Sequence, residues 1–326
     1  MATDFTEETA ADAVIESFAP SIDPRLREVL TSLVRHLHAF ARDVELTIPE
    51  WSTAIDFLTR TGHKCDDDRQ EFILLSDVLG LSMLTETISN RKFGVATEST
   101  VLGPFHVVES PPLALGANID KVGTGVPCVV TGRVVSVDGT PLPGATLDVW
   151  QASDQGFYDV QQPEVQPRGN GRGLFTADGD GRFWFRTIVP SYYPIPTDGP
   201  VGELLIATGR HAFRPAHIHF IVTAPGHRDL TTHIFVAGSK YIESDTVFAV
   251  KKSLVVDFAE VDDPAAGENW GVPVPFRHAD FEIIMQPGSL RLIRSGQGGA
   301  DGGVPELKAG LGQALGDDAG AGEQLR

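Results

Sequence analysis

Hydrophobic side chains in the first ninety residues follow the spacing of α-helices. From residue 26 to residue 40 they recur three or four positions apart, and Pro24 precedes them where a first helical turn tolerates proline. Residues 49–62 repeat this pattern and end on Gly62, a common helix terminator. A third run, residues 69–89, has an apolar face wider than one core contact requires, so a second copy of the protein could cover the excess.

From about Thr100 onward the pattern changes to that of strands. Residues 129–137 are rich in β-branched side chains, residues 146–150 alternate between apolar and polar, and a turn at residues 138–144 joins them. Further strands are predicted at residues 173–176, 182–188, 216–223, 231–236 and 281–286. Short strands separated by Gly, Pro and Asp turns indicate an antiparallel β-sandwich or barrel, of which we expect the sandwich. The predicted fold class is therefore α+β.

Three regions follow from these patterns. We expect a helical N-terminal dimerisation region at residues 1–99, a β-sandwich at residues 100–294 and a tail at residues 295–326. The tail is rich in Gly, Ala and Asp and cannot bury enough apolar surface to offset its ordering entropy, so it is expected to be disordered.

Composition and charge narrow the possible partners and compartment. The formal net charge of −18 argues against a nucleic-acid or anionic-membrane partner. Cys65 and Cys128 are too few for a disulfide scaffold, and the acidic first thirty residues have no apolar signal core. No run approaches the ~18 to 20 apolar residues of a spanning helix. We expect a cytoplasmic protein.

His217 and His219 stand two positions apart on one of the predicted strands. Successive strand residues point to opposite faces, so the two imidazoles share one face while Ile218 and Phe220 occupy the other. Imidazole is the commonest side-chain metal ligand, and a solvated pair of strand histidines is the alternative interpretation.

Three of the four tyrosines, Tyr158, Tyr192 and Tyr193, lie upstream of this pair, two of them beside prolines that restrict the backbone. Two phenolates with two imidazoles would neutralise most of the charge of a trivalent ion, which favours ferric iron over zinc. Packing in the sheet is the alternative for each tyrosine.

Several segments, in their order along the chain, resemble the intradiol ring-cleaving dioxygenases. They are residues 102–105, 132–134 with 143–145, 148–152, 156–158, the Tyr193 segment, 209–211, 214–220 and 230–235. The resemblance covers roughly residues 5–290, and within the family residues 193–202 and 232–235 are most similar to the hydroxyquinol 1,2-dioxygenases. It implies a catalytic β-sandwich that uses O2 to open the ring of an aromatic o-diphenol between its two hydroxylated carbons.

The resemblance also implies the cofactor and its ligands. These would be a non-haem Fe(III) ion held by Tyr158, Tyr193, His217 and His219. Tyr193 is preferred to its neighbour Tyr192 because the ligand in similar enzymes directly precedes a Pro-Ile-Pro segment. Tyr193 would also accept a proton from the substrate.

Two further side chains have implied roles in catalysis. Arg214 would stabilise anionic charge on the ring, with a structural ion pair as its alternative role. His233 would contact substrate or oxygen, or else support the ligands from behind. A larger set is implied to line the substrate pocket: Leu74, Asp77, Val101, Leu102, Gly103, Pro104, Phe105, Ile195, Pro196, Arg214 and Val247.

The resemblance implies hydroxyquinol as substrate, cleaved to 3-hydroxy-cis,cis-muconate or maleylacetate. At the implied pocket wall, Asp77 could accept a hydrogen bond from the third ring hydroxyl; the alternative interpretation of Asp77 is a charge on the helix surface. Catechol or a chlorocatechol is the alternative substrate. Residues 132–149 alone also resemble non-enzymatic transthyretin-like modules, which lack the tyrosines and histidines. We expect a homodimer formed through the N-terminal helices, and the family resemblance allows a phospholipid at that interface.

Overall fold

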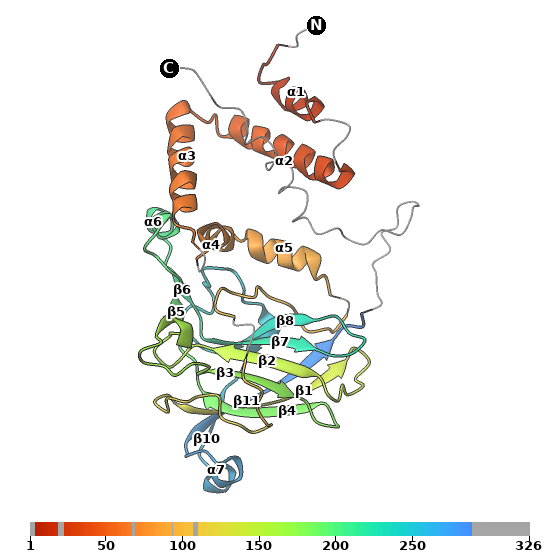
Figure 1. The fold of residues 1–326 in the computed structure, drawn as a ribbon, viewed down its shortest axis with the longest axis vertical. Coiled ribbons are helices and arrows are strands. Elements are labelled where there is room, and N and C mark those ends of the chain that lie inside the picture. The colour runs from red at the N-terminus through yellow and green to blue at the C-terminus, as the bar shows by residue number, and fades with distance from the viewer. Residues whose placement is uncertain (1–3, 19–22, 67–68, 93, 107–109, 289–326) are drawn as a thin grey trace, which may run out of the picture. The chain divides into compact units, whose positions relative to one another are not determined.

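The computed structural model describes residues 4–18, 23–66, 69–92, 94–106 and 110–288 (Figure 1). The tail predicted to be disordered, residues 295–326, lies outside this part of the chain. The predicted division between a helical region and a sandwich at residue 99 stays a prediction.

The N-terminal helices are α1 (Ala10–Glu16), α2 (Pro24–Asp43), α3 (Ile48–His63), α4 (Glu71–Val78) and α5 (Leu81–Ser89). Helices α2 and α3 begin at side-chain caps. The carboxylate of Asp23 accepts the Leu26 N–H of α2 at 2.9 Å, and Thr47 with Glu50 forms a reciprocal capping box at α3. These contacts satisfy amides that the first helical turn leaves unpaired.

The prediction of one helix over residues 69–89 is wrong. The chain breaks after Val78, and α4 and α5 meet at an angle of 81°. Gly80 takes φ +74° there, a left-handed conformation that a glycine adopts without the steric cost of a side chain. The wide apolar face therefore belongs to two helices that point in different directions.

Two main sheets pack face to face. One has the strand order β10 (Ala259–Val261), β11 (Phe276–Met285), β1 (Pro127–Ser136), β4 (Arg182–Ile188); the other has β3 (Arg172–Thr176), β2 (Thr146–Gln151), β7 (His217–Thr223), β8 (Leu230–Val236), β9 (Val255–Val256). Most neighbours are antiparallel, but β1 with β11 and β8 with β9 are parallel. The α+β class is confirmed, with sheets that are mixed rather than wholly antiparallel.

Several short elements carried too little periodicity to be predicted. These are β5 (Tyr193–Pro194), β6 (Phe213–Arg214), β9, β10, α6 (Pro200–Ala207), α7 (Pro264–Trp270) and two 3-10 turns, Asp159–Gln161 and Lys252–Leu254. Strand β11 also begins five residues before the predicted start at residue 281, because its early residues pair with β1 from Arg277 onward.

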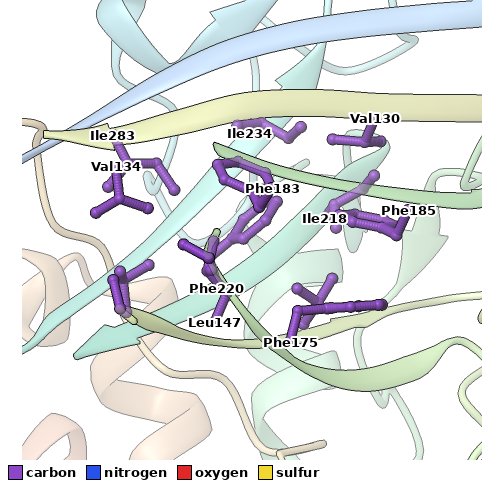
Figure 2. Close-up of a cluster of buried hydrophobic side chains, with 14 of the residues drawn as sticks. Val130, Val134, Leu147, Phe175, Phe183, Phe185, Ile218, Phe220, Ile234 and Ile283 are labelled. Atoms are coloured by element: carbon purple, nitrogen blue, oxygen red, sulfur yellow. The ribbon is translucent and has the colours of Figure 1, made fainter. Parts of the chain in front are cut away.

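The core between the sheets is built from alternate strand positions (Figure 2). Val130 and Val134 of β1 face Phe220 and Ile218 of β7, with Phe183 of β4 among them, and all are buried. Because the even-numbered residues of β7 fill this core, His217 and His219 must point to the opposite face, as the alternation predicted. The sandwich thereby presents both imidazoles away from its own interior.

A second apolar cluster covers the face of β7 and β8 that carries the histidines. It joins Leu74 of α4, Val201 of α6 and Phe235 of β8 with the loop residues Ile195 and Val247. In the described ranges no single helix is long and apolar enough to cross a membrane; α4 and α5 reach the required length and composition only as a bent pair.

Candidate metal centre

Four side chains that are far apart in sequence bring their polar atoms together. Tyr158 Oη lies 3.0 Å from His219 Nε2 and 3.3 Å from Tyr193 Oη. His217 Nε2 lies 3.1 Å from His219 Nε2 and 3.5 Å from Tyr193 Oη. The four predicted ligand atoms therefore form a closed ring, and each residue is at most 3% exposed.

Short loops hold the two tyrosines in place. Tyr158 precedes the 3-10 turn Asp159–Gln161, and its backbone N–H donates to Gln161 Oε1 at 2.9 Å. Gly156 takes φ +83°, and a Cβ there would lie 2.8 Å from the Tyr192 carbonyl oxygen and 3.1 Å from Tyr193 Cβ. A glycine is thus required where the two tyrosine segments approach each other.

The imidazoles are oriented from β7. His217 Nδ1 lies 2.7 Å from the Pro215 carbonyl oxygen, so Nδ1 carries the hydrogen that donates to it and Nε2 keeps its lone pair for a ligand. Trp150 of β2 stacks on His219 with ring centroids 4.5 Å apart and an interplanar angle of 12°. The imidazoles of His217 and His219 are thus held by neighbouring groups in orientations that point Nε2 of each ring toward the two tyrosines.

A third histidine adjoins the pair. His233 of β8 is the cross-strand partner of His219, and one nitrogen from each of His217, His219 and His233 falls within a 4.8 Å cluster. Among the described residues neither ring nitrogen of His233 has a hydrogen-bond partner of regular geometry, although the Val101 backbone lies near enough to oppose slightly the lowering of its pKa by burial, and its side chain is fully buried. His217 and His219 belong to both possible sets of donors, the three histidines or the two histidines with Tyr158 and Tyr193. Only the second set includes phenol oxygens, which become anionic donors when a bound cation favours the loss of their proton.

Burial decides the protonation of these groups when no cation is bound. It lowers the pKa of His217, His219 and His233 well below the ordinary histidine value, with the Arg214 charge adding to the effect at His217. Burial likewise raises the pKa of Tyr158, followed by the effect of Tyr193. The imidazoles are therefore neutral donors, and a bound cation is what would make a phenolate favourable in this setting. This chemistry fits a hard, highly charged metal ion.

Arg214 reaches the same ring of atoms from β6, where it pairs with Tyr193 of β5. Its Nη1 lies 3.3 Å from both Tyr193 Oη and His217 Nε2, and its Nε lies 3.3 Å from Asp245 Oδ1. Burial is the largest single influence on Arg214 and acts to lower its pKa, but the charges of Asp245, Tyr193 and Tyr158 and the hydrogen bond to Asp245 together raise it. Sequence reasoning missed Asp245, because no local motif links it to an arginine 31 residues earlier.

The structure gathers several of the predicted pocket residues around this centre. Phe105 stacks on Tyr158 at 4.7 Å, and a Cβ at Gly103 would lie 3.2 Å from His219 Cε1. Asp77 of α4 is partly buried; burial raises its pKa, while Ser82 and then the Arg214 charge lower it. The remaining predicted residues are Leu74, Val101, Ile195 and Val247 in the second apolar cluster, the half-buried Pro196, and Leu102 and Pro104 with exposed side chains.

Two surface hollows lie elsewhere in the described structure. One of ≈850 Å³ extends from Arg210 to Lys252 and reaches Asp245, and one of ≈950 Å³ lies on the outer face of the β1 sheet between Arg133 and Trp270. Neither includes the tyrosines or histidines of the centre, so the chemistry of the side chains, not the size of a hollow, identifies the site.

Comparison with known proteins identifies related sequences and a related fold. Two family models match, "Catechol dioxygenase N terminus" over residues 23–97 and "Dioxygenase" over residues 108–287. The chain is 52% identical to hydroxyquinol 1,2-dioxygenase of a Rhizobium species over 82% of this chain and 90% of that protein. It is also 52% identical to 6-chlorohydroxyquinol 1,2-dioxygenase of Cupriavidus pinatubonensis, over 87% and 99%. A crystal structure of hydroxyquinol 1,2-dioxygenase from Pseudomonas putida superposes with a TM-score of 0.82 at 49% identity, covering 86% of this chain and 98% of the other.

Proposed function

The chain belongs to the intradiol ring-cleavage dioxygenase family, and on that premise we propose that it cleaves hydroxyquinol with O2 between the two adjacent hydroxylated carbons. The product would be 3-hydroxy-cis,cis-muconate or its tautomer maleylacetate. The ring of two phenol oxygens and two imidazole nitrogens is the observation that carries this proposal. Family membership argues against the alternative of a non-enzymatic transthyretin-like module, because such modules lack these tyrosines and histidines.

We propose that Tyr158, Tyr193, His217 and His219 hold a non-haem Fe(III) ion. The donor set supports this assignment, because two phenolates offset most of a trivalent charge while the neutral imidazoles complete the coordination. When bound, ferric iron withdraws electron density from the substrate and activates its ring toward O2.

The residues around the ligands would manage protons and charge. Tyr193 Oη would accept a proton from a substrate hydroxyl as the diphenol binds, and Nη1 of Arg214, 3.3 Å away, would stabilise the negative charge that the substrate then carries. His233 would remain neutral beside the bound substrate, since burial lowers its pKa.

We propose that Asp77 selects hydroxyquinol over catechol. A partly buried carboxylate that accepts a hydrogen bond from the third ring hydroxyl would lose that hydrogen bond when catechol binds instead. The walls of the pocket would come from Leu74, Ile195 and Val247, which already pack together. Catechol or a chlorocatechol remains the alternative substrate, favoured by the apolar character of those walls.

We also propose that the active enzyme is a homodimer. Helix α2 leaves Leu33, Leu37 and Phe40 more than half exposed, and Trp51 of α3 is 51% exposed. Large apolar side chains in one helical region are typical of a surface that a second subunit covers. A phospholipid between the subunits would bury part of the same surface.

The visible absorption spectrum tests the proposed function directly. Iron-loaded protein is expected to be coloured by a tyrosinate-to-iron charge-transfer band, and anaerobic hydroxyquinol is expected to shift that band before O2 is admitted. Admitting O2 should then give the ring-opened product. A protein that stays colourless after reconstitution with iron would overturn the assignment of the four ligands. A coloured protein that does not cleave hydroxyquinol would overturn the assignment of the substrate.

A further inference from the structure

We propose that Asp245 is a positioning residue that sets the orientation of Arg214 and the position of the Val247 wall together. The inference rests on the proposed ring cleavage, because Arg214 and Val247 belong to its site. Asp245 lies outside the ring of ligand atoms. Among the described residues its side chain forms hydrogen bonds with Arg214, Val247 and Ala249, none of which is a proposed ligand.

The carboxylate of Asp245 accepts hydrogen bonds from backbone N–H groups of the turn that follows it. Oδ1 accepts the backbone N–H of Val247 at 3.3 Å and Oδ2 accepts that of Ala249 at 3.1 Å, while the Asp245 carbonyl accepts the N–H of Phe248 at 3.0 Å. Phe248 takes φ +59°, a left-handed conformation that is sterically unfavourable for a residue with a side chain. The contacts to one aspartate thus hold a strained turn that carries Val247 in the second apolar cluster.

The same carboxylate also fixes the guanidinium. Arg214 Nε lies 3.3 Å from Asp245 Oδ1, and both side chains are at most 3% exposed, so the pair has little competition from water. With Nε directed to Asp245, the planar group must present Nη1 to Tyr193 Oη and His217 Nε2. Its Nη2 is buried and has no partner among the described residues, which leaves it as a donor for charge on a bound substrate.

A second arginine ties this turn to the helix that carries Asp77. Arg210 donates from Nη1 to the Val78 carbonyl at 2.6 Å and from Nη2 to the Thr246 carbonyl at 2.8 Å, and it lies over the Phe248 ring at 5.1 Å. The end of α4 and the turn at residues 245–249 are therefore held as one unit. A displacement of Asp245 would thus move Arg214 and also the two sides of the proposed pocket that carry Asp77 and Val247.

Four variants test the proposal: Asp245→Asn, Asp245→Glu, Arg214→Gln, and the double variant that combines Asp245→Asn with Arg214→Gln. Asp120→Asn is a matched control, because Asp120 is also buried and also accepts the backbone N–H groups of Val122 and Gly123 in a turn, but has no arginine partner among the described residues. Measured quantities are kcat and KM for hydroxyquinol, the charge-transfer band of the resting protein, and the melting temperature without iron.

We expect Asp245→Asn to lower kcat by about 10- to 100-fold, the range that small misplacements of a catalytic group produce, with a smaller change in KM. The charge-transfer band should shift in the same direction as in Arg214→Gln, because both changes alter the group beside Tyr193 Oη. Asp245→Glu should recover part of kcat and part of the band position, and Asp120→Asn should leave both unchanged.

The double variant distinguishes positioning from general destabilisation. If Asp245 acts through Arg214, adding Asp245→Asn to Arg214→Gln should cost little further kcat, so the two effects are far from multiplicative. The double variant buries no unpaired charge and provides this answer even if Asp245→Asn alone does not fold. Multiplicative effects, or a wild-type band and kcat in folded Asp245→Asn, would overturn the inference. Failure of the wild-type protein to cleave hydroxyquinol would instead overturn the proposed function.

Discussion

At the scale of single residues, burial keeps the three histidines at the centre neutral. His217, His219 and His233 are each no more than 1% exposed, and burial is the largest cause of their lowered pKa values. An iron-free protein must therefore protonate three buried imidazoles, or unfold, as the solution becomes acidic.

The first prediction concerns the pH dependence of iron-free stability. The unfolded chain binds protons to these histidines below about pH 6.5, whereas the folded chain does not, so the free energy of unfolding should fall as pH decreases through that value. Each histidine contributes up to about 1.4 kcal/mol per pH unit. Urea unfolding at several pH values, with His233→Gln for comparison, should show a slope smaller by about one proton in the variant. Identical slopes would contradict the neutral state of His233.

The second prediction concerns substrate choice at Asp77. Asp77→Asn should reduce the preference for hydroxyquinol over catechol by roughly 10-fold, the value of one hydrogen bond to a buried charged group. The ratio of the two kcat/KM values measures this preference. Asp43→Asn, an exposed position at the end of α2, is the control. An unchanged ratio in Asp77→Asn would return Asp77 to the role of a structural charge.

At the scale of elements, the bend between α4 and α5 depends on Gly80. Its φ of +74° and the Phe248 ring, 3.4 Å from where a Cβ would be, both disfavour a side chain. Gly80→Ala should lower the free energy of unfolding by about 1–2 kcal/mol, measured by urea denaturation. Gly179→Ala is the matched control, because Gly179 has no positive φ and a Cβ added there would meet no atom within 4 Å. Equal effects of the two changes would contradict this account of the bend.

Elements with a sustained period were predictable from the sequence, and those fixed by contacts were not. The spacing of apolar residues located α2 and α3 to within a few residues, and alternation placed both imidazoles of β7 on one face. The break at Gly80 was missed because the apolar pattern continues through it. The two-residue strands β5 and β6 exist because Tyr193 pairs with Arg214, a contact that no local pattern encodes.

The candidate centre was predictable to a similar extent. Motif resemblance named Tyr158, Tyr193, His217 and His219, and the structure brings all four together, although their role as ligands stays a proposal. The ion pair between Arg214 and Asp245 could not be predicted, because it depends on how a loop after β8 folds back against β6. Spatial partners of catalytic groups are therefore what the fold adds to the sequence.

At the scale of the whole molecule, the exposed apolar surface of α2 predicts self-association. Leu33→Glu with Leu37→Glu places charges where both side chains are 56% exposed and should give a particle of one 35.1 kDa chain in sedimentation, whereas wild type should have twice that mass. Val165→Glu, at a position 65% exposed in the loop after Tyr158, should leave the mass unchanged. A wild-type particle of single-chain mass would exclude the homodimer.

Because β1 pairs with β11, which is far along the chain, β1 cannot complete its pairing until late in biosynthesis. About 140 residues of chain separate the end of β1 at Ser136 from the start of β11 at Phe276. At a translation rate of about 5–20 residues per second, β1 waits about 7 to 30 s on the ribosome for one of its two neighbours. During that interval one edge of a strand with buried valines is open to wrong partners. The sandwich can be completed only after nearly all of residues 4–288 have been synthesised.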